Sequence, residues 1–563
     1  MKLRTIYQAA VMLCLTVASQ LFPSCSQPES DLVAFVEDNQ LRTPNDTVSS
    51  LVGIVGKMQV IADRTVLLGE LRGELTSLTD HAKLDLKAIA DFTARADNPY
   101  NNARDYYAVI QNCNYFLAHA DTALMKRGYK VFEKEYAVIK AYRAWTYLQL
   151  ALNYGRVPFF DQPILAYKNA VPDNYPFYDV KDVAEYFITD LAPYVDTDYP
   201  AYGTIGSYNS SFFYIPVRVL LGDFCLWAGR YREAARYYHD YLTKRNDTHP
   251  TGTSSVGWTD YDFDHIADSY SSAFSNITRN EFLAVIPMEQ SEYDGIESHL
   301  DDVFSSTDDN NYYYQATHSP AYDQLSQAQR YVLVYQDPVT LLPDTLSPAD
   351  TVTYASETMR GDLRLYSNYR LRANLSSGST AYSTLTQTCY KQYTTTCVYL
   401  YRLQHVYLRF AEALNRAGYP ESAFAVLKYG LWYENVNKYI GERERTEASD
   451  LLNFSQYSFD RSNTQGIHSR GSGNAAADTT YVIPQLATRA DSILFVEDKI
   501  CDEMALETAA EGVRFYDLMR LATHRDDPTY LADRVARRNG AANYDYDLYT
   551  KLSDKRNWYL PLE

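Results

Sequence analysis

The stretch LLGDFCLWAGRYREAARYY, residues 220–238, predicts two antiparallel helices joined by a tight turn. Small residues occur at Gly222, Cys225 and Ala234, and Tyr238 adds a large ring. Gly229 lies where the chain must reverse direction. Small residues let two helices approach closely and large ones fill the groove between them, so we expect a tightly packed helix pair.

A second copy of this pattern lies far downstream. Residues 410–414 form its first helix, the chain turns at residues 417–419, and the pattern resumes at Ala423 and Leu427. The offsets in both copies are typical of the tetratricopeptide helix–turn–helix. Because the copies are so far apart, they do not predict an uninterrupted solenoid, and we expect a large insertion between them.

The first half of the chain is predicted to be mainly helical, and residues 245–400 are predicted to differ from it. The apolar positions that recur at three-and-four spacing within residues 133–154 are Val138, Ala141, Trp145, Leu148 and Leu152. Residues 245–400 are rich in Ser, Thr, Asp, Asn, Gly and Tyr, and their clearest strand-like piece is 281–288. We expect a loop-built surface seated on a helical frame.

Composition and charge argue against several functions. The chain has 563 residues, of which 46% are hydrophobic, and a formal net charge of −19. A field of that sign repels a phosphate backbone, so nucleic acid is not expected as a partner. The sequence contains no G-x-S-x-G elbow, H-E-x-x-H motif, P-loop or Rossmann fingerprint, and we expect no enzyme. A pair of glycosidase carboxylates would leave no sequence signature and stays an alternative.

No cofactor and no metal site is predicted. Aspartates are paired at residues 301–302 and 308–309, but the glycine-centred spacing of a calcium loop is missing, and solvated carboxylates are the simpler interpretation. No pair of cysteines or histidines has zinc spacing.

The amino terminus predicts an export signal. Lys2 and Arg4 form a short basic start, and residues 7–22 are almost uncharged but too short for a comfortable bilayer span. Cys25 follows residues 21–24, a loose version of a bacterial lipobox, so we expect Cys25 to carry lipid at the start of the mature chain. An ordinary signal with a bystander cysteine is the alternative. The remaining cysteines are too few for a disulfide scaffold; Cys389 and Cys397 either oppose one another in a hairpin or are buried free thiols.

Tyrosine is the unusual residue of this composition. The chain has 53 tyrosines against 22 phenylalanines and 5 tryptophans. A tyrosine ring offers an apolar face that stacks on the C–H face of a sugar, and a hydroxyl that hydrogen-bonds the edge of the sugar. For any single tyrosine, half-burial between helices with the hydroxyl at the surface is the simpler interpretation.

The run DEMALETAAEGVRFYDLMR at residues 502–520 resembles the diagnostic motif of the SusD/RagB family, the surface glycan-binding lipoproteins of Bacteroidota nutrient uptake. The resemblance continues at residues 107–114, 361–364, 408–415 and 558–561, in family order. This sequence departs from the family at Ala505, Thr508 and Ala509, where Arg, Glu and Phe are typical. The resemblance implies a mainly α fold: a SusD-like, tetratricopeptide-type helical scaffold with long irregular loops and a few short strands.

The resemblance also implies a domain plan and partners. A signal peptide (1–24) and a lipidated tether (25–36) precede a helical region (37–244), a loop-rich ligand-binding region (245–400) and a carboxyl-terminal helical region (401–563). We expect the protein to be lipid-anchored at the cell outer membrane and to face the exterior. There it would capture a glycan and act as the lid of a SusC-like TonB-dependent barrel.

Candidate ligand residues follow from the regions that carry the ligand surface in the family. They are Arg72, Asp80, Asn98, Tyr100, Asn101, Trp258, Tyr261, Tyr293, Tyr312, Tyr313 and Tyr314. Aromatic faces would supply most of the binding energy, while the charged and amide groups fix orientation. Two alternatives stay open: RagB-like binding of peptides for uptake through the same type of transporter, and a scaffold or adhesion lipoprotein without a transport role.

The carboxyl-terminal motif is expected to be structural rather than catalytic. If residues 503–520 are largely helical, Glu511, Arg514, Asp517 and Arg520 are spaced for three- and four-apart ion pairs. Each exposed pair contributes only about 0.2–0.5 kcal/mol, so a buried Arg514 or Asp517 that locks neighbouring helices would matter more.

Overall fold

The computed structural model describes residues 44–205, 208–244, 254–275, 277, 281–288, 296–348, 352–354, 357–375, 382–454 and 465–562. The expected signal peptide, the tether with Cys25, and Tyr293 lie outside these residues. No helix among the described residues is both long and apolar enough to cross a membrane.

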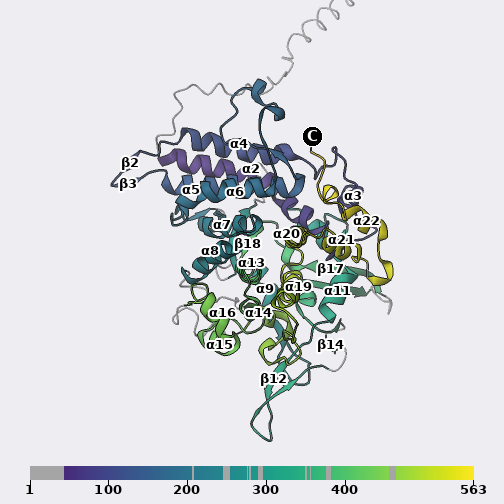
Figure 1. Cartoon of the computed structure of the whole chain (residues 1–563). Helices are drawn as coiled ribbons and strands as arrows, with labels where there is room; N and C mark the ends of the chain where they lie inside the picture. The colour runs from purple at the N-terminus through teal and green to yellow at the C-terminus, as the bar shows by residue number, and fades with distance from the viewer. Residues whose placement is uncertain are drawn as a thin grey trace, which may run out of the picture.

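Helices build the upper part of the molecule in Figure 1. The main amino-terminal helices are α2 (Pro44–Glu70), α3 (Leu84–Ala90), α4 (Ala103–His119), α5 (Glu133–Tyr154), α6 (Val180–Leu191), α7 (Val217–Trp227) and α8 (Tyr231–Lys244). Two-residue or three-residue strands connect them: β1 (Thr76–Leu78), β2 (Met125–Lys126), β3 (Tyr129–Lys130), β4 (Val157–Pro158), β5 (Phe177–Tyr178), β6 (Thr204–Ile205) and β7 (Tyr208–Asn209). Helix α5 has the bounds expected from its apolar stripe and is buried along most of its length.

The predicted helix pair at residues 220–238 is confirmed as α7 and α8. A Cβ placed on Gly222 would lie 2.5 Å from Cε1 of Tyr238, so the ring of Tyr238 occupies the space that glycine leaves open. The Tyr238 hydroxyl donates a hydrogen bond of 2.6 Å to Asp223. The second predicted pair is confirmed as α13 (Leu403–Arg416) and α14 (Pro420–Lys428), and α13 packs on α8.

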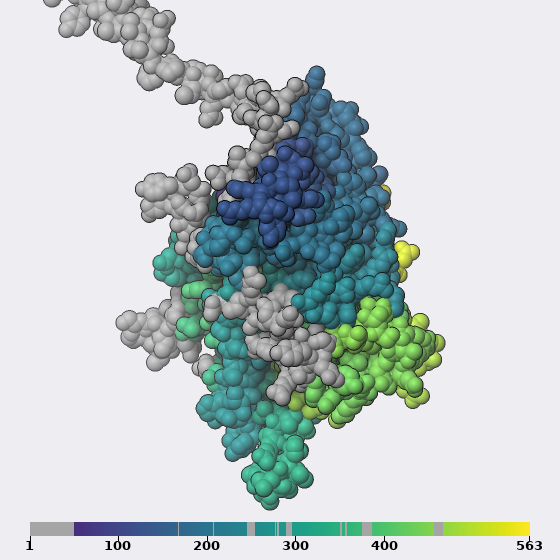
Figure 2. Space-filling view, turned by 90° about the vertical axis from the view of Figure 1, so that its left-hand side faces the viewer, coloured from purple at the N-terminus to yellow at the C-terminus, as the bar shows by residue number. Residues whose placement is uncertain are grey.

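Short hairpins and helices fill the segment between the two pairs. Its strands are β8 (Val256–Trp258), β9 (Ile266–Asp268), β10 (Phe282–Pro287), β11 (Ala316–His318), β12 (Leu333–Gln336), β13 (Pro343–Leu346), β14 (Val352–Tyr354), β15 (Glu357–Met359), β16 (Tyr369–Leu375), β17 (Tyr382–Cys389) and β18 (Cys397–Arg402). Its helices are α9 (Tyr270–Ser275), α10 (Leu300–Phe304), α11 (Pro320–Gln327) and α12 (Arg364–Asn368). The β12–β13 hairpin forms the lower tip in Figure 1, and the teal-green tip of Figure 2 is the same segment.

Strand β10 confirms the strand expected at residues 281–288 and pairs antiparallel with β18. Cys397 therefore lies opposite Pro287, whereas Cys389 ends β17 opposite Tyr369. The two cysteines do not oppose one another in a hairpin, and both are buried free thiols. Of the two alternatives, the free-thiol interpretation is confirmed.

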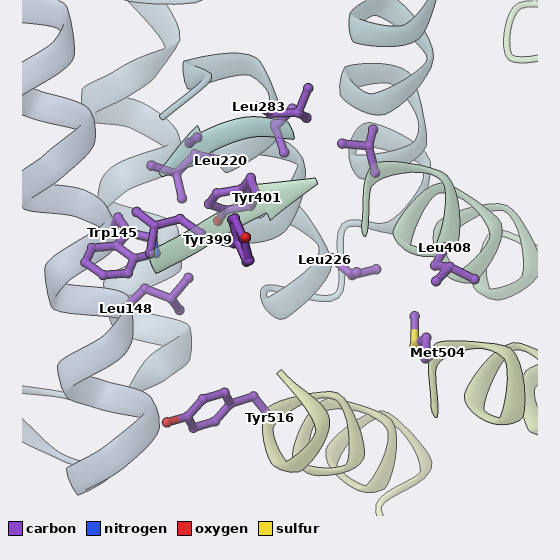
Figure 3. Close-up of a cluster of buried hydrophobic side chains, with 14 of the residues drawn as sticks. Trp145, Leu148, Leu220, Leu226, Leu283, Tyr399, Tyr401, Leu408, Met504 and Tyr516 are labelled. Atoms are coloured by element: carbon purple, nitrogen blue, oxygen red, sulfur yellow. The ribbon is translucent and has the colours of Figure 1, made fainter. Parts of the chain in front are cut away.

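One hydrophobic core runs from Leu51 to Leu560. Figure 3 shows its centre, where side chains from α5, α7, β10, β18 and α13 converge with those of α19 (Arg489–Thr508) and α20 (Arg514–Arg525). The other carboxyl-terminal helices are α15 (Tyr433–Tyr439), α16 (Glu442–Glu447), α18 (Ser469–Ser472), α21 (Thr529–Ala536) and α22 (Tyr546–Leu552).

The motif at residues 502–520 divides between α19 and α20. The chain breaks between them because Ala510 and Gly512 have left-handed φ angles of 65° and 78°. Gly512 packs so closely on α2 that a Cβ there would lie 2.4 Å from the Cα of Val66. The expectation of one largely helical segment is therefore correct for its two ends and wrong for its middle. Of the expected local ion pairs, Asp517–Arg520 forms at 2.8 Å.

Candidate functional site

Two chain segments that the sequence singled out separately meet at one surface. Strand β1 pairs antiparallel with β11, so that Leu78 lies opposite Ala316. Beyond the strands, the Thr79 amide donates to the carbonyl of Gln315 (2.9 Å) and the Thr79 hydroxyl donates to the carbonyl of Tyr314 (2.9 Å). Asp80 is thereby held beside the Tyr312–Tyr314 run.

The loop at residues 307–314, called here the tyrosine loop, is held in its conformation by the side chain of Asn310. The Asn310 amide donates to the carbonyls of Asp302 (3.0 Å) and Ser305 (2.7 Å), while its side-chain oxygen accepts from the amide of Thr307 (2.9 Å). The next two residues, Asn311 and Tyr312, have φ angles of 57° and 65°. Non-glycine residues rarely adopt such angles, and strain of this kind is concentrated at functional sites.

The tyrosine loop presents an aromatic ridge, which we define as His81, Tyr312 and Tyr313. The rings of His81 and Tyr313 stack with centroids 4.1 Å apart and an interplanar angle of 18°. Tyr312 and Tyr313 are 56% and 53% exposed, so their faces are available to a ligand. A hydrogen bond to Asp308 raises the pKa of Tyr312 and holds its hydroxyl in place.

Four of the predicted ligand residues are buried, and their side chains serve the scaffold. The Arg72 guanidinium donates to the carbonyls of Leu68 (2.7 Å) and Trp558 (3.0 Å), to Asn153 and to the Tyr516 hydroxyl. The amides of Asn98 and Asn101 donate to backbone carbonyls, and the ring of Trp258 packs edge-on against Phe263 and Tyr354. These four side chains are buried, so a ligand cannot reach them in this structure.

The other predicted residues divide between two ends of the molecule. Asp80 is exposed beside the aromatic ridge, Tyr314 is half-buried beneath it, and Tyr100 is half-buried in the loop before α4. Tyr261 is 61% exposed, and its ring lies 6.3 Å from that of Tyr335 on β12. Figure 1 places β12 at the lower tip and α3, which follows the Asp80 segment, at the upper right. Tyr261 therefore does not share a surface with the ridge.

The carboxyl-terminal motif holds a buried charge network, called here the Glu507 network. Glu507 accepts from Arg364 (2.9 Å), Arg402 (3.0 Å) and Arg470 (3.1 Å), and all four side chains are at most 4% exposed. Glu503, one turn earlier on α19, pairs with Arg364 (2.8 Å), and Glu511, in the break between α19 and α20, pairs with Arg402 (2.6 Å). Burial alone would raise the pKa of Glu507, but the three guanidiniums hold it at about 2. These groups lie too deep for a polysaccharide and act as structure.

Arg514 joins this motif to Glu74, in the turn between α2 and β1. Its guanidinium donates through Nε to both carboxylate oxygens of Glu74, at 3.0 and 3.1 Å, and through Nη1 to the carbonyl of Cys501 at 2.8 Å. Side-chain exposure is 2% for Arg514 and 8% for Glu74. The ion pair thus ties the carboxyl-terminal motif to the turn that follows α2.

A cavity in the core and a surface cluster of acidic residues with a histidine complete the candidate sites. A cavity of about 60 Å³ lies at the core between α5, α7 and α20, where Asp223, Arg409 and Arg520 line it; it can hold a few water molecules but no sugar. Among the residues that the structure describes, one group of three side chains could hold a metal ion: Asp260, Asp264 and His265. Their potential ligand atoms lie within 4.8 Å of one another. Hydrogen bonds from His265 to the two carboxylates raise the pKa of this imidazole. Exposed acidic groups of this kind are common without an ion.

Residues 363–563 match the model of the SusD family. Solved structures extend the likeness over most of the chain. A SusD superfamily protein from Bacteroides vulgatus is 13% identical with a TM-score of 0.55 and covers 92% of this chain and 95% of its own. One from Bacteroides thetaiotaomicron is 15% identical with a TM-score of 0.53, covering 85% and 89%.

A third solved structure, described as a putative sugar binding protein from Bacteroides vulgatus, is 17% identical with a TM-score of 0.53 and covers 86% of this chain and 88% of its own. No curated protein matches the sequence. The resemblance and the fold class expected from the sequence are confirmed.

Proposed function

Starting from a SusD-like chain, whose residues 363–563 match the SusD family and whose fold is that of solved SusD superfamily proteins, we propose that this protein captures a glycan without cleaving it. The observation that carries the proposal is the aromatic ridge: an exposed ring stack on a strained loop that hydrogen bonds hold in place.

The ridge suits a sugar for three reasons. The stacked rings of His81 and Tyr313 limit each other's motion, so little side-chain freedom is lost when a ligand binds. The exposed faces of Tyr312 and Tyr313 offer two surfaces for sugar C–H groups. The Asp80 carboxylate and the tyrosine hydroxyls can hydrogen-bond hydroxyl groups at the rim. One solved relative is described as a putative sugar binding protein, which supports this class of ligand.

The proposal includes the setting that the sequence predicted. Lipid on Cys25 would anchor the chain at the outer membrane, where the body would act as a lid over a SusC-like TonB-dependent barrel and deliver the glycan to it. The formal charge of −19 favours neutral glycans over anionic ones, because the field of the protein repels like charge.

Affinity electrophoresis tests the proposal. The purified protein is run in native gels that contain amylopectin, xylan, galactomannan or mixed-linkage β-glucan, and at least one polysaccharide should retard it. Replacing both ridge tyrosines, Tyr312→Ala with Tyr313→Ala, should weaken binding about 30-fold, because each stacked ring contributes about 1 kcal/mol.

Tyr393→Ala is the matched control, since Tyr393 is 59% exposed in another loop and should leave retardation unchanged. Retardation of the double variant equal to that of the wild type would refute the ridge as the binding surface. Calorimetric binding of a peptide digest in the absence of any retardation would favour the peptide alternative instead.

A further inference from the structure

A tyrosine-lined hollow, separate from the aromatic ridge, lies near the carboxyl terminus between α21 and α22. Its volume is about 370 Å³, and its lining residues are Asp533, Arg537, Ala541, Tyr544, Tyr546 and Tyr549. This volume is at the lower end of the range for small-molecule sites, about 300–1,000 Å³. Neither the carboxyl-terminal motif nor the aromatic ridge includes any of these residues.

Three tyrosine rings form the walls of this hollow. The Tyr544 ring lies 4.8 Å from that of Tyr546 at 59° and 6.1 Å from that of Tyr549 at 47°. The rings are tilted rather than stacked, and all three line the hollow. Tyr546 is 74% exposed, which places a large ring in water with one face free.

An ion pair forms the polar side of the hollow. Arg537 donates through Nε and Nη2 to the two carboxylate oxygens of Asp533, both at 2.9 Å, and the Tyr544 hydroxyl donates to the same carboxylate at 3.1 Å. Burial and the hydrogen bond to Asp533 raise the pKa of Tyr544 to about 12. The Arg537 guanidinium also lies 5.5 Å from the Tyr544 ring centroid.

The local sequence fixes this geometry. Asp533 and Arg537 are four residues apart along α21 and its C-cap, so their side chains meet on one face. Asp545 caps α22 by accepting from the amide of Leu548 at 2.9 Å, and this cap orients Tyr546 at the first position of the helix. The hollow is thus built from rigid helix ends.

We propose that this hollow is a second glycan subsite, which binds one neutral sugar unit of the same polysaccharide. The Tyr546 face would stack on the sugar ring, while the Asp533–Arg537 pair would receive its hydroxyl groups. Because the carboxylate and the guanidinium neutralise one another, the hollow does not select a charged ligand, and the net charge of −19 disfavours an anionic one.

Hydrogen bonds connect residues beside the hollow to the chain segment that carries Asp80 and His81. Arg538, next to the hollow, donates to the carbonyls of Gly73 (2.9 Å) and Ala90 (3.1 Å), which bracket Asp80 and His81. Lys551 on α22 donates to the carbonyl of Phe92 at 2.6 Å. A polysaccharide chain that contacts both sites would gain apparent affinity because the second contact is intramolecular. The inference therefore rests on the proposed glycan function.

Affinity electrophoresis with the same four polysaccharides tests the second subsite. Tyr546→Ala should weaken binding of the polysaccharide that retards the wild type about fivefold, and Tyr546→Phe should retain binding because the ring face is kept. Tyr129→Ala is the matched control, since Tyr129 is 78% exposed on the β2–β3 hairpin and should have no effect.

The outcomes separate the two proposals. If Tyr546→Ala is retarded by the polysaccharide as much as Tyr129→Ala, while the ridge double variant loses binding, the second subsite alone is overturned. Equal losses for Tyr546→Ala and Tyr546→Phe would also overturn it, because stacking would not be the cause. If none of the four polysaccharides retards the wild type, the proposed function fails and the second subsite fails with it.

Discussion

Replacing Glu507 by glutamine should destabilise the protein severely. Glu507 is fully buried and is the carboxylate on which Arg364, Arg402 and Arg470 converge. The glutamine amide keeps the shape of the side chain but removes its charge, so three buried guanidiniums lose a common counter-ion. The difference in stability between the wild type and E507Q therefore reports the contribution of the charge, because the packing is kept.

Two estimates of the magnitude agree. Removing one partner of a buried ion pair costs about 3–5 kcal/mol, because the remaining charge stays desolvated and uncompensated. The pKa of Glu507 falls from its ordinary 4.5 to about 2, which corresponds to about 3 kcal/mol at 1.36 kcal/mol per pH unit. We expect E507Q to lose about 3 kcal/mol of unfolding free energy at pH 7.

Urea denaturation followed by circular dichroism measures this loss. At a slope of about 3 kcal/mol/M, the midpoint of E507Q should lie about 1 M below that of the wild type. E447Q is the matched control, because Glu447 pairs with Arg443 at the surface and its replacement should leave the urea midpoint unchanged. An E507Q midpoint within 0.2 M of the wild type would refute the structural role of the network.

The pH dependence of the difference gives a second check. A carboxyl whose pKa is lowered on folding stabilises the protein above its unfolded pKa, and this contribution is lost as pH falls through the folded value. The gap between wild type and E507Q should therefore be complete above pH 5 and shrink as pH falls from 4.5 towards 2. A gap that is constant over this range would mean that the charge of Glu507 is not its source.

The remaining predictions concern packing and anchoring. Gly222→Val should lower the unfolding free energy by about 2 kcal/mol, because a Cβ at this position would lie 2.5 Å from Cε1 of Tyr238. Thermal melting measures the loss, and Gly53→Ala is the control, because a Cβ on the exposed Gly53 meets nothing within 4 Å. Cys25→Ser should move the protein from the membrane fraction to the soluble fraction of cells, and unchanged fractionation would count against the lipid anchor.

The helical frame could be predicted from sequence because its signals are local. The stripe of α5 and the small residues of α7 and α8 lie within a few turns of one another, and the structure confirms these helices. Strand β10 was also predictable as a short apolar run. The interruption before α20 was missed although Gly512 signalled it, because the need for a break comes from the close approach of α2.

The charge network could not be predicted, because its partners come from distant parts of the chain. Glu503 and Glu507 pair with arginines at positions 364, 402 and 470. Arg364 stands in the 361–364 segment that carries the family resemblance, but nothing in its local sequence indicates that its partners are Glu503 and Glu507. The same limit applies to Arg72 and Asn101, which were candidates because they lie in the early helical region that carries ligand-binding loops in the family. Their actual partners, Trp558 and Pro561, lie more than 450 residues away.

The candidate site was predictable in part. Tyr312 and Tyr313 attracted notice because they stand together in a polar loop, and both are exposed. His81 gave no sequence signal, since only the pairing of β1 with β11 brings it onto Tyr313. The hollow at α22 was also missed, because its tyrosines are spread over six residues and meet only through the turn before the helix.

Glycan capture without cleavage is the central claim, and one calorimetric titration tests it most directly. The oligosaccharide series from the polysaccharide that retards the protein is titrated into the wild type, and the sugar is then recovered and sized by mass spectrometry. We predict saturable binding, loss of most of the affinity when Tyr312 and Tyr313 are both alanine, and recovery of the oligosaccharide at its original length. Shortened oligosaccharide, or equal affinity for the wild type and the double variant, would contradict the account.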